Sequence, residues 1–152
     1  MKVEDGEATL MILREEKAMY PFSTYALTVS QSSKRQLAKY LGAVIVFKDG
    51  SVKEIEEIER LGYYGSKLSE KISSALFGVY RIKTTLRNSA VSLADLRSMI
   101  AEYLTLDIET EDPTFELKDA SATATKISDA TSIEDIVQLM ELPSPLDCLD
   151  VL

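Results

Sequence analysis

The sequence predicts an α+β fold: an antiparallel or mixed sheet of about four to six strands, covered mainly on one face by about two to four helices, with an acidic C-terminal extension. Three observations support this prediction. The 152 residues, of which 45% are hydrophobic and 28% charged, suit one domain with a substantial core. Strand-like and helix-like patterns follow one another in irregular order, and acidic residues concentrate towards the C-terminal end.

The first two predicted elements are strands. Residues 8–13 are almost entirely apolar, and in residues 24–29 Tyr25, Leu27 and Val29 alternate with smaller or polar side chains. The intervening residues 14–23 contain a Tyr-Pro pair, so we expect a turn or loop there.

A short helix and a buried strand are predicted next. Ser32 and Ser33 can cap a helix that ends at Gly42 and has one basic face. Residues 43–47, Ala-Val-Ile-Val-Phe, are typical of a central strand that is covered on both faces.

Residues 52–61 have two alternative interpretations. The Asp49-Gly50 pair predicts a turn. Apolar residues then recur at every third position, with glutamates between them: Val52, Ile55, Ile58 and Leu61. This spacing favours a helix, and the second arm of a hairpin remains the alternative.

A helix and a two-faced strand follow. Ser66 can cap a helix that ends at Gly78 and carries one apolar stripe: Leu68, Ile72, Ala75 and Leu76. Residues 79–87 then predict a strand with an apolar side and a basic side, and the basic side should face solvent or a partner.

The next predicted helix begins with a capping box at residues 92–95 and continues with helical spacing to Leu104. Residues 106–108 and 115–117 each predict a short strand. We therefore assign residues 1–118 to one α+β domain.

The remaining chain is predicted to form a linker and a terminal segment. Residues 119–131 are mostly small and polar, which favours a linker. Residues 132–152 predict an acidic amphipathic helix, capped by Thr131 and ended by Pro143 and Pro145, and a C-terminal tail.

Charge is distributed unevenly along the chain. The net charge is −8, but residues 105–152 contain twelve acidic and two basic residues and carry −10. The preceding residues contain fifteen basic and thirteen acidic residues and carry +2. A mildly basic body is thus followed by a strongly acidic segment, which suggests a basic partner.

No catalytic apparatus is recognisable in the sequence. The chain has no histidine, which removes the commonest general base and the commonest neutral metal ligand. The glutamates at 54–59 fit a solvated face better than a magnesium site, and the carboxylates at 107–112 do not follow the EF-hand spacing. We therefore predict a protein that is not an enzyme and needs no cofactor or metal.

The single cysteine, Cys148, excludes an internal disulfide, which fits a reducing compartment. The acidic first residues and the short apolar run at 8–13 predict neither a secretion signal nor a membrane span. We expect a cytoplasmic protein that has no membrane partner.

Our leading functional hypothesis is a non-catalytic regulator, adaptor or inhibitor that docks an acidic surface on a basic protein. Immunity-type inhibitors work by this physics. The predicted protein-binding residues are Asp107, Glu109, Glu111, Asp112, Ile133, Ile136, Val137, Met140, Leu146 and Leu149. The apolar residues of the terminal helix could equally pack on their own domain.

The alternative hypothesis is a nucleic-acid-binding domain regulated by its acidic tail. Its predicted phosphate-contacting residues are Lys34, Arg35, Lys39, Arg81, Lys83 and Arg87. These charges could also simply keep the surface soluble or be covered by the acidic tail. The sequence leaves open the partner's identity, the oligomeric state and whether the terminal segment packs on the domain.

Overall fold

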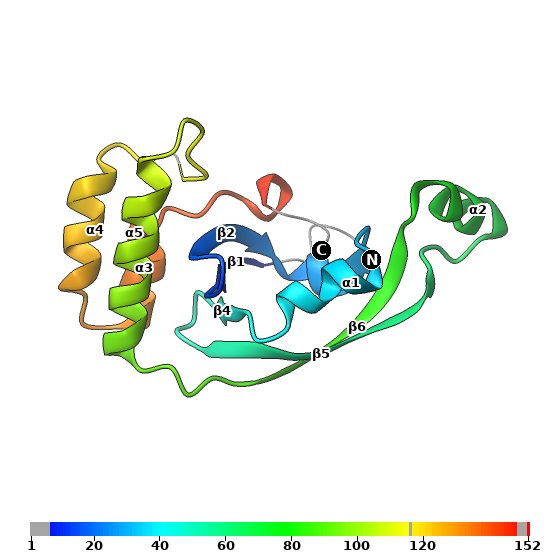
Figure 1. Cartoon of the computed structure of the whole chain (residues 1–152), viewed down its shortest axis with the longest axis horizontal. Helices are drawn as coiled ribbons and strands as arrows, with labels where there is room; N and C mark the ends of the chain where they lie inside the picture. Colours follow the sequence, from blue (N-terminus) through cyan, green and yellow to red (C-terminus); the bar gives the residue numbers. More distant parts are fainter. Residues whose placement is uncertain (1–6, 116, 149–151) are drawn as a thin grey trace.

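Six antiparallel strands form one curled sheet with the order β2-β1-β4-β5-β6-β3 (Figure 1). The computed structural model describes residues 7–115, 117–148 and 152. Its strands are β1 (Ala8–Leu13), β2 (Ala18–Ser23), β3 (Val29–Ser30), β4 (Val44–Val46), β5 (Val52–Tyr63) and β6 (Tyr80–Asn88). The predicted α+β class is confirmed, with an antiparallel sheet.

Five α-helices and three 3-10 helices accompany this sheet in the described part of the chain. The α-helices are α1 (Lys34–Leu37), α2 (Leu68–Phe77), α3 (Leu93–Ile108), α4 (Ala120–Ser128) and α5 (Ile133–Leu139). The 3-10 helices are η2 (Thr24–Leu27), η3 (Ala38–Tyr40) and η4 (Pro145–Asp147).

Strands β1 and β4 separate two hydrophobic cores. On one face, Leu10 and Val44 pack with helices α3, α4 and α5. On the other face, Met11 and Ile45 pack inside the curl of the sheet with residues of α1, β5 and β6. Every residue of β1 and β4 is buried, so the predicted central strand within 43–47 is confirmed.

The prediction for residues 14–29 is wrong. Residues 18–23 form β2, and the expected strand at 24–29 is instead η2 followed by the two-residue strand β3. Pro21 is compatible with β2 because β2 lies at the edge of the sheet, where a missing N–H costs no ladder hydrogen bond. The Ser23 hydroxyl accepts the Tyr25 N–H and so caps the turn that ends this strand.

The favoured helix at residues 52–61 is also wrong, because these residues belong to β5. Register shifts interrupt its pairing with β6 between Ile55 and Glu57 and between Arg60 and Gly62. A bulge adds one residue to a strand, so Ile55 and Ile58 lie three positions apart and still share a face. The first bulge thus explains the helix-like spacing of Ile55 and Ile58, whereas Val52 packs on the other core and Leu61 is exposed.

The sequence also misplaces elements after residue 104. Leu106 and Ile108 lie in the last turn of α3, and neither Phe115 nor Leu117 belongs to a strand. The expected linker at 119–131 contains α4, which is capped by the Asp119 carboxylate and buries Ala124 and Ile127.

The predicted terminal helix is confirmed as α5, with Ser132 rather than Thr131 as its cap. The last residue returns to the sheet: the Leu152 N–H donates to Val29 O at 3.2 Å, and Leu152 O accepts the Gln31 N–H at 2.9 Å. Leu152 and Cys148 are both buried, so these two residues are packed on the fold.

Candidate functional site

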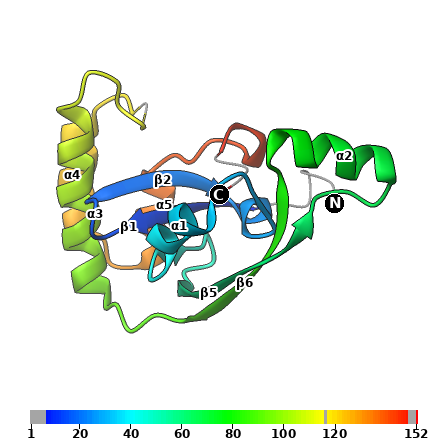
Figure 2. The same ribbon diagram turned by 45° about the vertical axis from the view of Figure 1, so that its right-hand side comes forward.

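The distal parts of β5 and β6, together with α2, form a projection that we call the arm (residues 60–83). Figure 2 shows α2 at one end of the molecule, while α3 and α4 stand at the opposite end. We call the other described residues the body. The arm exists because β5 and β6 remain paired as far as Tyr63 and Tyr80, so the chain between these tyrosines must form α2 outside the sheet.

Within the arm, helix α2 contacts the end of β5 and the residues next to it through its polar side. The Ser74 hydroxyl donates to Tyr64 O at 2.6 Å, and the Val79 N–H donates to Ser74 O at 2.8 Å. Gly78 ends the helix in the left-handed region, with φ +67°. Ser74 is the only buried residue of α2, so the side of α2 that meets β5 is not its apolar side.

The apolar side of α2 is uncovered. The exposed fractions are 75% for Leu68, 55% for Ile72, 79% for Leu76 and 72% for Phe77. An isolated helix of ten residues is marginally stable in water, and its stability normally comes from packing of its apolar face. The sequence predicts Leu68, Ile72, Ala75 and Leu76 as this stripe and does not include Phe77, the last residue of α2. Nothing in the stripe itself reveals that it lies outside the core.

Aromatic residues pack together at the base of the arm. The rings of Tyr63 and Tyr80 stack with their centroids 4.9 Å apart, and the Arg60 guanidinium lies 3.7 Å from the Tyr80 centroid. The hydrogen bond to Tyr80 raises the pKa of Tyr63. A hydrogen bond of 3.1 Å also joins the hydroxyls of Tyr25 and Tyr64. The base therefore holds α2 in a defined position relative to the body.

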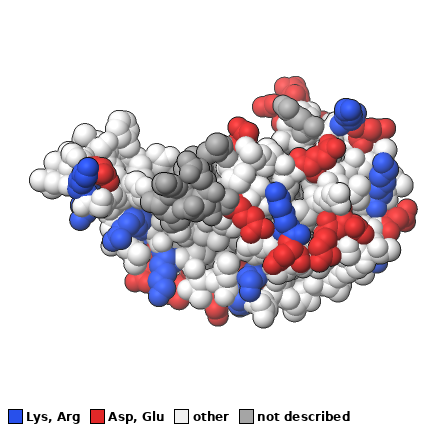
Figure 3. All heavy atoms as spheres, turned by 180° about the vertical axis from the view of Figure 1, so that it is seen from behind, with Lys and Arg blue, Asp and Glu red and all other residues white. Residues whose placement is uncertain are grey.

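The arm and the remainder of the chain have opposite net charge. Residues 60–83 contain five basic residues and one acidic residue, a net charge of +4. The remainder of the chain therefore carries −12 out of the total of −8. Figure 3 shows the acidic side chains concentrated on the half of the molecule away from the arm.

Much of this acidity gathers at one place that the sequence does not reveal. Strand pairing places the β1–β2 turn beside the end of α3, so Glu16, Asp107 and Asp112 line one cavity of about 460 Å³. We call the following residues the acidic end: Glu15, Glu16, Glu102, Asp107, Glu109, Glu111 and Asp112. Lys17 lies among them and pairs with Glu102 at 3.3 Å.

The four predicted acidic residues have different surroundings. Asp107 accepts hydrogen bonds from the Thr114 and Phe115 N–H groups at 2.9 and 3.1 Å, so its carboxylate holds the loop after α3. Glu109, Glu111 and Asp112 are exposed, and they are the members of the predicted set that remain accessible.

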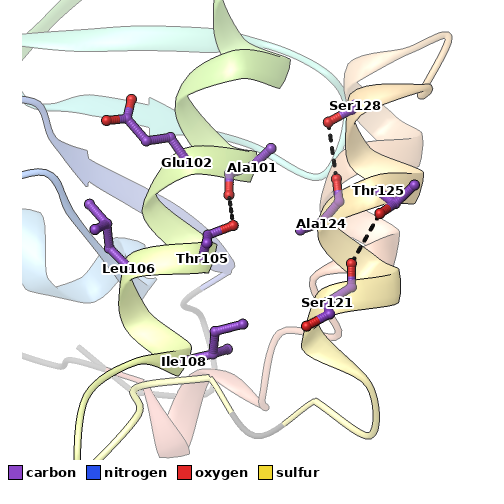
Figure 4. A pocket seen from close by; sticks show the side chains of 9 residues that line it. All are labelled: Ala101, Glu102, Thr105, Leu106, Ile108, Ser121, Ala124, Thr125 and Ser128. Atoms are coloured by element: carbon purple, nitrogen blue, oxygen red, sulfur yellow. Dashed lines mark hydrogen bonds between the residues drawn. The ribbon is translucent and has the colours of Figure 1, made fainter.

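An open groove of about 550 Å³ separates α3 from α4 (Figure 4). The residues that line it are Ala101, Glu102, Thr105, Leu106, Ile108, Ser121, Ala124, Thr125 and Ser128. The hydroxyls of Thr105, Thr125 and Ser128 each donate to a carbonyl four residues earlier in their own helix. Because these hydroxyls are already bonded, the groove is more apolar than its sequence indicates.

The predicted phosphate-contacting residues do not form one surface. Helix α1 lies against the side of β5 that carries Ile58, whereas Arg81, Lys83 and Arg87 alternate with inward residues such as Ile82. Lys83 faces Glu59 across the ladder. Lys34, Arg35 and Lys39 are exposed on α1 and η3, on the other side of the sheet.

Arg87 belongs to an ion-pair cluster around the buried carboxylate of Glu54. It contacts Glu54 at 3.0 and 3.1 Å, and Arg14 and Ser89 contact the other carboxylate oxygen at 3.3 and 3.1 Å. Burial opposes ionisation of Glu54, but the hydrogen bonds from Arg87 and Ser89 and the charges of both arginines hold its pKa below the usual value. This cluster stabilises the sheet, and Arg87 is already paired with Glu54 rather than free to contact a phosphate.

The predicted apolar binding residues of α5 are part of the core. Ile136, Val137 and Met140 are buried, and Ile133 packs against the same cluster. The structure thus agrees with the alternative in which this face packs on its own domain. The side chain of Leu146 and the whole of Leu149 lie outside the described residues.

Neither a metal-binding cluster nor a membrane-crossing helix occurs among the described residues. No group of three or more Cys, Asp or Glu side chains is arranged to hold a metal ion there. None of the helices has the length and apolar composition of a membrane-crossing segment.

Burial and the neighbouring Asp147 raise the pKa of the Cys148 thiol, which disfavours a reactive thiolate.

The chain was also compared with known proteins. No protein-family model, curated protein or solved structure matches it.

Proposed function

We propose that this chain is a non-catalytic protein-binding protein, of the regulator, adaptor or inhibitor class. Two surfaces carry the binding: the apolar side of α2, and the acidic end, which docks on a basic surface. The exposure of Leu68, Ile72, Leu76 and Phe77 on a helix that projects from the body is the observation that carries the proposal. An exposed apolar patch of this kind is typical of a protein-interaction site.

Several observations favour a protein partner over nucleic acid. Lys83 and Arg87 lie beside glutamates, and Lys34, Arg35 and Lys39 lie on another side of the sheet. A phosphate backbone needs a continuous array of free cations. The accessible Glu109, Glu111 and Asp112 would repel it.

The proposal is tested by affinity capture from native cytosol with three immobilised chains. The Leu76→Ser/Phe77→Ser variant removes the two apolar side chains at the C-terminal end of α2, and Leu41→Ser removes an apolar residue that is 50% exposed in the body. We expect wild type and Leu41→Ser to retain the same partner, and the α2 variant to lose it. Equal retention by all three chains would show that α2 is not the binding surface.

The acidic end is tested in the same assay by neutralising its accessible members. Glu109→Gln/Glu111→Gln/Asp112→Asn leaves Asp107 and its backbone contacts intact, and Glu56→Gln is an exposed control within β5. We expect the triple variant to release the partner at lower salt than wild type and the control. Identical salt elution of all three would remove the acidic end from the proposal.

A further inference from the structure

We propose that a second copy of this chain is a partner of the arm: α2 of each protomer docks in the α3–α4 groove of the other. The pairing rests on the proposed function only in using α2 as a binding surface. The new inference is that the partner is a second copy of this chain and that α2 binds in its α3–α4 groove.

Charge complementarity selects the second copy. The arm carries +4, and its Lys67 and Lys71 flank the apolar side of α2. On the body, Glu102 is the acidic residue that lines the groove, and Asp107, Glu109, Glu111 and Asp112 follow at the end of α3 and in the loop after it. A basic apolar helix and an apolar groove that lies beside the acidic end are therefore both present on one chain.

The apolar surfaces also match in kind. The groove presents alanine and threonine methyl groups together with Leu106, which is 40% exposed. The hydroxyls of Thr105, Thr125 and Ser128 are already bonded to their own helices, so covering them with Leu76 or Phe77 leaves these three groups with their partners. This pairing resembles the general mode in which an amphipathic helix binds in a hydrophobic groove.

The positions of the two surfaces favour a reciprocal pair. Helix α2 and the groove lie at opposite ends of the molecule, so α2 cannot fill the groove of its own chain (Figures 1 and 2). A twofold axis between two antiparallel copies brings each arm to the other's groove. The two equivalent contacts add their areas, and a stable interface needs roughly 1,200 Å² or more.

An anionic bilayer is the competing occupant, because α2 is amphipathic and carries lysines. The charge of −12 outside the arm opposes approach to a negatively charged membrane surface. The second copy instead presents the carboxylates of its acidic end beside the groove.

The test is a complementation experiment in analytical ultracentrifugation. The arm variant is Leu76→Ser/Phe77→Ser, and the groove variant is Thr105→Arg/Thr125→Arg, which places bulk and positive charge on two exposed groove positions. We expect wild type and the Leu41→Ser control to dimerise. Each variant alone should dissociate at least ~100-fold more readily, as for loss of a central interface anchor.

An equimolar mixture of the two variants is the decisive sample. It retains one intact arm and one intact groove, so we expect a heterodimer, whereas neither variant pairs with itself. Unchanged circular dichroism confirms that both variants are folded. A mixture that stays monomeric overturns the reciprocal contact, and so does a variant that dimerises as tightly as wild type.

Wild-type protein that remains monomeric up to roughly 1 mM also overturns the inference. Binding to phosphatidylserine vesicles that is lost in the arm variant, with no dimer of the wild type, assigns α2 to membranes instead. If the wild-type chain is monomeric but still captures a partner through α2, the proposed function stands and the second copy is not the partner.

Discussion

The arm and the body contain the same kind of amphipathic pattern, but only the body covers it. In α3, the apolar residues Leu96, Ile100 and Leu104 are fully buried against the sheet. In α2, Leu68 and Leu76 keep at least three quarters of their surface in water. An amphipathic period predicts a helix, but it does not state which molecule covers the apolar side.

The two regions also differ in what holds them. The body is stabilised by two cores on opposite faces of β1 and β4. The arm is stabilised by one strand pair, the aromatic base around Tyr80, and the hydrogen bonds of Ser74. Substitutions in the body should therefore change folding, and substitutions on α2 should change association.

The largest expected difference comes from truncating one leucine in each region. Leu104→Ala leaves a cavity in the body and should lower the free energy of unfolding by about 2–5 kcal/mol. Leu76→Ala should change it by less than about 0.5 kcal/mol, because the side chain is already exposed. Urea unfolding at low protein concentration measures both values. Similar losses for both variants would mean that α2 packs on its own chain.

A smaller effect is expected at the ion-pair cluster of the body. Glu54→Gln should cost about 1–3 kcal/mol, since it leaves Arg87 and Arg14 with weaker hydrogen bonds. Both arginines are half-exposed, so we expect a smaller loss in the free energy of unfolding than for a fully buried ion pair.

The same carboxylate gives a pH dependence of definite sign. The folded pKa of Glu54 is lowered from 4.5, so its contribution is complete above 4.5 and is lost as the pH falls through the folded value. The free energy of unfolding of wild type should therefore decline towards that of Glu54→Gln as the pH falls below 4.5. A difference that stays constant down to pH ~2 would contradict the assigned pairing.

A local effect is expected at the junction between β5 and α2. Gly65 has φ +120°, and a Cβ at this position would lie 2.5 Å from the Glu70 Cβ. Gly65→Ala should therefore destabilise α2 by about 1–3 kcal/mol while the body keeps its stability. Gly78→Ala is the matched control, because it has positive φ but no atom within 4 Å of the added Cβ. Hydrogen exchange should increase more in α2 of Gly65→Ala than in α2 of the control.

The elements that sequence reasoning predicted correctly are those with strong local signals. The apolar run of β1, the continuous strand β4 and the helices α2, α3 and α5 all follow from residues close together in the chain. The predicted Ser66 cap is wrong, because the N-cap of α2 is Lys67 and no side chain caps it. Strand β2 was missed because its proline is tolerated only at a sheet edge, which is a tertiary property.

Tertiary context also explains the errors at β5 and α4. A bulge in β5 gives Ile55 and Ile58 a helix-like spacing, and the small residues of α4 look like a linker because their helix depends on packing against α3. The acidic end was predicted in part: Glu109, Glu111 and Asp112 are exposed there, but Glu15 and Glu16 join them only through strand pairing. The arm was missed as a site because its exposure depends on the strand assignment of β5.

Hydrogen exchange of the wild-type chain at several protein concentrations tests the central claim most directly, because it monitors α2 and the α3–α4 groove in one sample. Docking between copies predicts that protection of α2 and of the groove residues around Thr105 and Thr125 rises together as concentration increases, with the two cores of the body unchanged. Exchange in α2 that is fast and independent of concentration, with no change in the groove, would contradict it.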